Sequence, residues 1–60
     1  SINEPDGYVF EEVGECLLAL GRADEAAPNF AAAYELLSQD AWLVRDEPAR
    51  LERLKMLGQG

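Results

Sequence analysis

The chain has 60 residues, of which 48% are hydrophobic, and twelve Asp and Glu against five Lys and Arg give a net charge of −7. A chain of this length forms one domain at most, over residues 1–60. One Cys excludes an internal disulfide, and the absence of His excludes Ser-His and Cys-His catalysis and the usual zinc sites. We therefore expect no enzyme activity, no catalytic residue, no metal and no cofactor.

The negative charge is concentrated in the first two thirds of the chain. Residues 1–40 contain nine acidic residues and one Arg, whereas residues 41–60 contain three acidic and four basic residues. Nucleic acids and anionic membrane surfaces bind proteins through Lys and Arg, so neither is an expected partner. The acidity indicates either a solubilising surface or a surface that attracts a basic partner. No apolar run is long enough to span a membrane, and the lone Cys fits a reducing, cytoplasmic location.

Helix-forming residues dominate the composition and no segment alternates apolar and polar residues, so the sequence predicts an all-α fold. The first predicted helix covers residues 5–20. Pro5 and Asp6 suit its first turn, and Gly21 suits its end. Its apolar side consists of residues at helical spacing, namely Val9, Phe10, Val13, Gly14, Cys16, Leu17 and Leu20.

The second predicted helix covers residues 23–39. Proline is tolerated in a first helical turn, so Pro28 places the start near Arg22 or Ala23. The apolar stripe of this helix contains Ala26, Phe30, Ala33, Tyr34 and Leu37.

Two further segments follow the second helix. The three consecutive apolar residues 42–44 are expected to fold onto the core as a loop or a single turn. A third helix is predicted over residues 47–57, with Asp46 or Glu47 as its cap and Pro48 in its first turn. Its apolar stripe contains Leu51, Leu54 and Leu57.

Two spaced patterns span the first two helices. They read Phe10-x-x-Val13-Gly14-x-x-Leu17 and then Ala26-x-x-x-Phe30-x-x-Ala33. This arrangement resembles the tetratricopeptide repeat (TPR), whose pattern is W-x-x-L-G-x-x-Y followed by A-x-x-x-F. The match covers about residues 7–40. It implies an antiparallel helical hairpin in which Gly14 and Ala26 are small because the helices cross there, with the third helix as a cap. A generic three-helix hairpin is the alternative.

The resemblance to TPR proteins implies a non-enzymatic protein–protein interaction module that acts as a scaffold or adaptor. In that family the first helices line the binding groove, and the corresponding side of this first helix carries Tyr8, Glu11, Glu15 and Leu18. We expect these residues to contact a protein or peptide of basic or amphipathic character. Trp42 is either a core or cap residue or a further partner contact.

The alternative function is a structural element that forms a homodimer, or a piece of a longer helical repeat protein with no separate ligand. Single repeats leave an apolar face bare, and Leu18 and Leu36 depart from the predicted core stripes, so a homodimer is expected. Cys16 is expected to be a small buried hydrophobe rather than a reactive thiol, because its neighbours Glu12 and Glu15 are anionic. The acidic residues of the first helix are expected to form a solvated face rather than a cation site.

Overall fold

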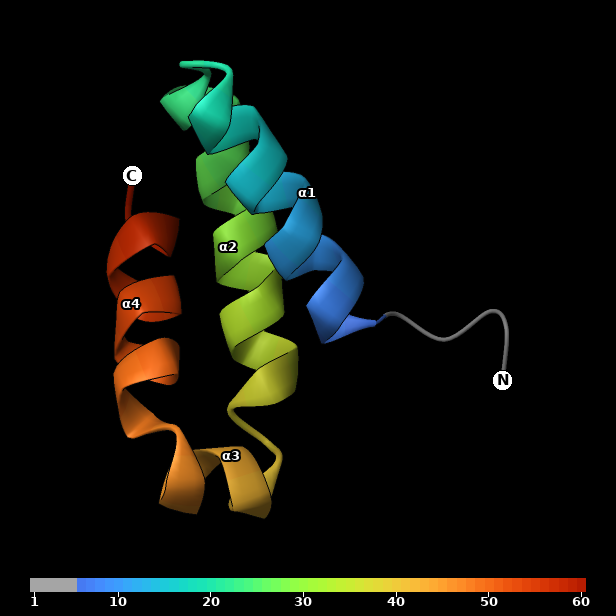
Figure 1. Ribbon diagram of the computed structural model, residues 1–60, viewed down its shortest axis with the longest axis vertical. Helices are drawn as coiled ribbons and strands as arrows, with labels where there is room; N and C mark the ends of the chain where they lie inside the picture. Colours follow the sequence, from blue (N-terminus) through green and yellow to red (C-terminus); the bar gives the residue numbers. More distant parts are fainter. Residues whose placement is uncertain (1–5) are drawn as a thin grey trace.

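The computed structural model describes residues 6–60, which form four helices and no strand. Helices α1 (Gly7–Ala19) and α2 (Ala23–Leu37) form an antiparallel hairpin, α3 (Ala41–Asp46) is short, and α4 (Pro48–Gly58) returns along α2. In the view of Figure 1, α2 lies between α1 and α4, and α3 closes one end. The predicted all-α hairpin is confirmed, with the three long helices ending within two residues of the predicted bounds.

The ends of α1 are fixed by its flanking residues. Asp6 is the N-cap in an extended conformation, and its carboxylate accepts a hydrogen bond of 2.9 Å from the Tyr8 N–H. Gly21 has a φ of +76°, which favours glycine, and the following Arg22 N–H donates to the Leu17 carbonyl over 2.9 Å. The predicted stop at Gly21 is therefore confirmed, whereas the expectation for Pro5 lies outside the described residues.

Helix α2 begins at Ala23, as predicted, but Pro28 does not lie in its first turn. Pro28 is the sixth residue of the helix. Because proline has no N–H, the carbonyl of Asp24 loses its usual helical partner. Both residues are exposed, so water can replace the missing bond.

Residues 41–46 form a helical segment where the sequence predicted a loop or a single turn. Asp40 caps it, and its carboxylate accepts a hydrogen bond of 2.9 Å from the Trp42 N–H. Leu43 is fully buried, whereas Trp42 is 53% exposed. The expectation that Trp42 belongs to the core or cap was wrong, because the six-residue helix turns Leu43 inward instead.

The core lies between α2 and the two helices beside it. It consists of the buried side chains Ala26, Phe30, Ala33, Leu37, Leu43, Leu51 and Leu54. The leucines of α4 thus cover α2, as expected of a capping helix. Helix α1 contributes its glycines, Gly7 and Gly14, as its buried residues. Cys16 is exposed, so its predicted burial was wrong.

Gly14 lies where α1 approaches the Phe30 ring. A Cβ atom at this position would be 3.0 Å from Cε1 of Phe30, so the predicted close approach at Gly14 is confirmed. We expect Gly14→Ala to lower the free energy of unfolding by about 1 kcal/mol, although Ala is the better helix former. Urea denaturation measures this change, and an equal or higher stability would contradict the packing.

Candidate functional site

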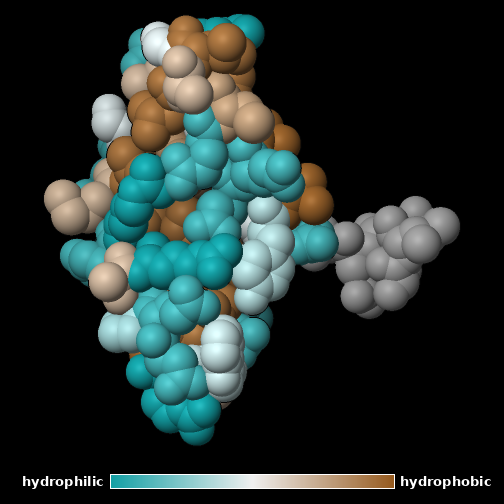
Figure 2. All heavy atoms as spheres, in the orientation of Figure 1, coloured by the Kyte–Doolittle hydropathy of each residue, from teal (hydrophilic) through white to brown (hydrophobic). Residues whose placement is uncertain are grey.

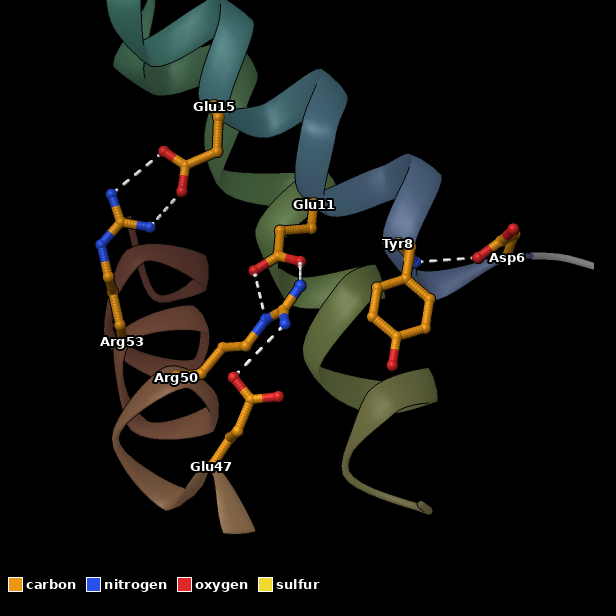
Figure 3. Close-up of polar contacts among 7 residues, drawn as sticks. All are labelled: Asp6, Tyr8, Glu11, Glu15, Glu47, Arg50 and Arg53. Carbon is orange, nitrogen blue, oxygen red and sulfur yellow. Dashed lines mark hydrogen bonds and ion pairs between the residues drawn. The ribbon is translucent and has the colours of Figure 1, made fainter. Parts of the chain in front are cut away.

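Two arginine side chains of α4 reach the acidic side of α1. The Glu11 carboxylate accepts two hydrogen bonds from Arg50, one of them 3.0 Å from Nε to Oε2. The Glu15 carboxylate accepts two from Arg53, one of them 3.0 Å from Nη2 to Oε1. Figure 3 shows both guanidinium groups reaching from α4 to α1. The face that the sequence assigned to a basic partner therefore faces a basic helix of the same chain.

The two ion pairs differ in burial. The Glu11 side chain is 14% exposed and that of Arg50 is 34% exposed, whereas Glu15 and Arg53 are 42% and 50% exposed. The Arg50 guanidinium also lies 5.2 Å from the centre of the Tyr8 ring. The hydrogen bonds to Glu11 raise the pKa of Arg50 above its ordinary value in spite of its partial burial. Arg50 therefore stays charged and holds a largely buried carboxylate.

This difference in burial predicts unequal costs for removing the two guanidinium groups. Arg50→Met should lower the free energy of unfolding by about 1–2 kcal/mol, because Glu11 is left largely buried without a partner. Arg53→Met should cost less than about 1 kcal/mol, since that pair is exposed to solvent. Thermal denaturation of the two variants at low salt measures the difference. Equal losses would show that the burial of Glu11 does not raise the cost of removing its arginine partner.

The predicted partner residues do not form one surface. Leu18 packs against the core and lines an apolar pocket of about 130 Å³. The other lining residues are Ala23, Ala26, Phe30, Met56, Leu57 and Gly60. Trp42 lies on α3, at the opposite end of the fold from the junction of α1 and α2. Tyr8 is 46% exposed beside Arg50. A role of these residues in binding stays a prediction.

A different surface of α1 carries exposed apolar side chains. Val9 is 55% exposed, Val13 41% and Leu20 69%, and Cys16 between them is also exposed. Their spacing of four, three and four places these side chains on one side of the helix. Figure 2 shows hydrophobic residues along the edge of the molecule that α1 forms. We call Val9, Val13, Cys16 and Leu20 the α1 apolar face.

Sequence reasoning assigned the α1 apolar face to the core because the apolar band of this helix is unusually wide. Gly7 and Gly14, seven residues apart, are the residues that α1 buries. Small residues at this spacing mark the side of a helix that comes closest to its neighbour. The valines lie on another side, so the glycine spacing was the signal that could have separated the two faces.

Glu12 borders the α1 apolar face. It is exposed, lies three residues after Val9, and has no ion-pair partner among residues 6–60. The arginines of this part of the chain all form ion pairs, namely Arg22, Arg45, Arg50 and Arg53. Lys55 is the one basic side chain there outside such a pair. Among residues 6–60, the charge outside ion pairs is therefore mainly negative.

Comparisons with protein-family models, with curated proteins and with solved structures find no match to this chain. The resemblance to TPR proteins therefore stays a hypothesis carried by the residues themselves. None of the helices formed by residues 6–60 is long and apolar enough to cross a membrane. Within the same residues, no group of three or more metal-binding side chains comes together.

Proposed function

We propose that this protein is a non-enzymatic interaction module, a TPR-like hairpin with a capping helix, that binds a helical segment of another protein. The observation that carries the proposal is the α1 apolar face. Val9 and Leu20 expose more than half of their surface on a helix whose opposite side is fixed by close packing at Gly14. Contiguous exposed apolar surface of this kind is typical of interaction sites. The lone Cys supports a cytoplasmic setting.

The spacing of the α1 apolar face determines the shape of its occupant. Steps of four and three residues are those of a coiled-coil seam, in which one helix inserts its side chains between those of another. Helix α1 has 13 residues, which corresponds to a length of about 20 Å. A partner helix of about three to four turns would cover it.

A second copy of the chain is the alternative occupant. Two α1 helices in antiparallel orientation would place Val9 against Leu20 and Val13 against Cys16 of the second copy. The same arrangement sets Glu12 near Ala19, so like charges would not meet directly. This self-complementary register supports the homodimer, but the net charge of −7 on each copy opposes it.

A display library of helical peptides tests the proposal. The peptides contain about three heptads, with Leu fixed along a seam of four and three residues and the other positions randomised. Selected peptides should bind Val13→Asp at least about tenfold more weakly, because a carboxylate would be buried in an apolar contact. Val44→Asp is the matched control, since Val44 is similarly exposed but lies on α3. Failure to select any peptide, or equal loss in both variants, would overturn the proposed function.

Light scattering at several concentrations separates the two occupants. A constant mass of one chain, 6.6 kDa, would exclude the second copy. A mass of two chains that falls to one in Val13→Asp, and not in Val44→Asp, would assign the α1 apolar face to the homodimer.

A further inference from the structure

We infer that the helix bound by the α1 apolar face carries Lys or Arg along one flank, and that Glu12 selects this charge. The inference rests on the proposed function and goes further, since it states the chemistry of the partner. The inference follows from the ion pairs of the fold, which occupy some glutamates of α1 and leave Glu12 unpaired among residues 6–60.

Three glutamates of α1 are the candidates for attracting a basic partner. Glu11 is 14% exposed and held by Arg50, and Glu15 is held by Arg53. Both carboxylates already have guanidinium partners on α4, so an incoming cation would have to displace them. Glu12 remains exposed with no ion-pair partner in the described part of the chain. Of the three, it is therefore the carboxylate available to an external cation.

Glu12 also has the right position on the helix. It lies three residues after Val9 and four residues before Cys16, on the flank of the α1 apolar face. In a pair of helices packed along such a seam, residues on the flank face the flank of the partner and set its charge preference. A Lys or Arg of the bound helix would meet Glu12 at this flank.

The opposite flank of the α1 apolar face has a different character. Phe10 and Leu17 occupy it, and both are partly buried against the core. They offer apolar contact and no charge. The expected partner is therefore basic on the flank over Glu12 and free of any charge requirement on the other.

The remaining charge of the molecule favours the same partner over a second copy. Outside ion pairs, residues 6–60 carry exposed acids on three helices, among them Glu12, Asp24, Glu35 and Glu52, against Lys55 as the single unpaired base. A basic helix approaches such a surface with favourable long-range attraction, whereas a second copy brings the same negative charge.

The peptides selected from the library described above test the inference directly. We expect Lys and Arg to be enriched on one flank of the Leu seam and not on the other. The best selected peptide should bind Glu12→Lys about tenfold more weakly at low salt, since the reversal replaces an attraction by a repulsion. Raising the salt to about 1 M, where the Debye length is about 3 Å, should remove most of this difference.

Glu52→Lys is the matched control for the Glu12 variant. It makes the same change of net charge at an exposed position of α4, and its affinity for the peptide should fall less than about threefold. Equal losses in the two variants would reduce the effect to net charge and overturn the role of Glu12. Selected peptides with neutral or acidic flanks that still need Val13 would overturn the inference and leave the proposed function standing. If Val13→Asp lost no more affinity for the peptides than Val44→Asp, both the proposed function and this inference would be overturned.

Discussion

Phe30→Ala is expected to remove a large part of the protein's free energy of unfolding and to lower its melting temperature strongly. The Phe30 side chain is 1% exposed and is among the largest that the fold buries completely. Its ring packs against Gly14, and the Arg53 guanidinium lies 5.9 Å from its centre. Truncation of a buried Phe costs about 3–5 kcal/mol. A domain of this size has a total stability of about 3–9 kcal/mol, so one such loss removes at least about a third of it and, at the lower end of the range, all of it.

The effect of Phe30→Ala can be measured by far-UV circular dichroism during heating. Phe10→Ala is the control, because Phe10 belongs to α1 and is only partly buried, and its melting temperature should fall much less. The melting temperature of Phe30→Leu should lie between those of Phe30→Ala and Phe10→Ala. A cooperative transition of Phe30→Ala within a few degrees of the wild-type temperature would show that α1 and α4 do not depend on this ring.

The sequence was a good guide to the helices because their ends depend on local chemistry. Asp6 and Asp40 each accept a hydrogen bond from a backbone N–H two residues later, and Gly21 takes the left-handed conformation after α1. These signals are read within a few residues. The helical character of the segment after Asp40 was underestimated, because three consecutive apolar residues show no helical period. In the structure this segment is a helix, and only Leu43 of the three is buried.

The sequence was a poor guide to the candidate functional surface, because the exposure of each side of α1 depends on which neighbouring helix packs against it. Glu11 and Glu15 were assigned to an outside partner, yet their partners are Arg50 and Arg53, about forty residues later. Nothing local in α1 reports on a helix so distant in the chain. Once α4 is in place, the acidic face is largely satisfied internally. The valines, assigned to the core, become the accessible surface.

Less apolar surface is left for a second copy to cover than the sequence indicated. Leu18 and Leu36 were expected to need cover from a second copy, but both are partly buried within the chain. Leu18 packs against the core, and Leu36 lies beside Gly7, where an added Cβ would be 3.2 Å from it. Three of the large apolar side chains that stay exposed, Val9, Val13 and Leu20, belong to the α1 apolar face, whereas Trp42, Val44 and Met56 are exposed on α3 and α4. The α1 apolar face is thus a narrower surface than the one the sequence indicated for a second copy.

Gly58 allows a sharper test of how α4 packs on α2. Gly58 is the last residue of α4, one residue beyond the helix predicted over residues 47–57. In the fold, a Cβ atom on Gly58 would lie 2.8 Å from both N and Cα of Ala31. Contacts this short do not occur between real Cβ atoms and their neighbours. The clash is with backbone, whereas at Gly7 and Gly14 an added Cβ would meet the side chains of Leu37 and Phe30.

Gly58→Ala should therefore destabilise the protein although Ala favours a helix by about 1 kcal/mol over Gly. A side chain can move by a few tenths of an ångström, but the α2 backbone at Ala31 cannot move without carrying the core residue Phe30 with it. We expect a loss of about 2 kcal/mol for Gly58→Ala and about 3 kcal/mol for Gly58→Leu. For a domain of this size, each kcal/mol lowers the melting temperature by about 4–8 °C.

The neighbouring Gln59→Ala controls for changes at the same end of α4, since Gln59 is exposed and follows the helix. It should leave the melting temperature within a few degrees of wild type. The change in stability of Gly58→Ala distinguishes two arrangements of α4, because they predict changes of opposite sign. If α4 packs on α2 through Gly58, stability falls; if its last turn is free of α2, the better helix former raises stability. If the added Cβ pushes α4 away from α2, it also pulls Arg53 away from Glu15. Adding Arg53→Met to Gly58→Ala should then cost less stability than Arg53→Met costs in the wild-type chain.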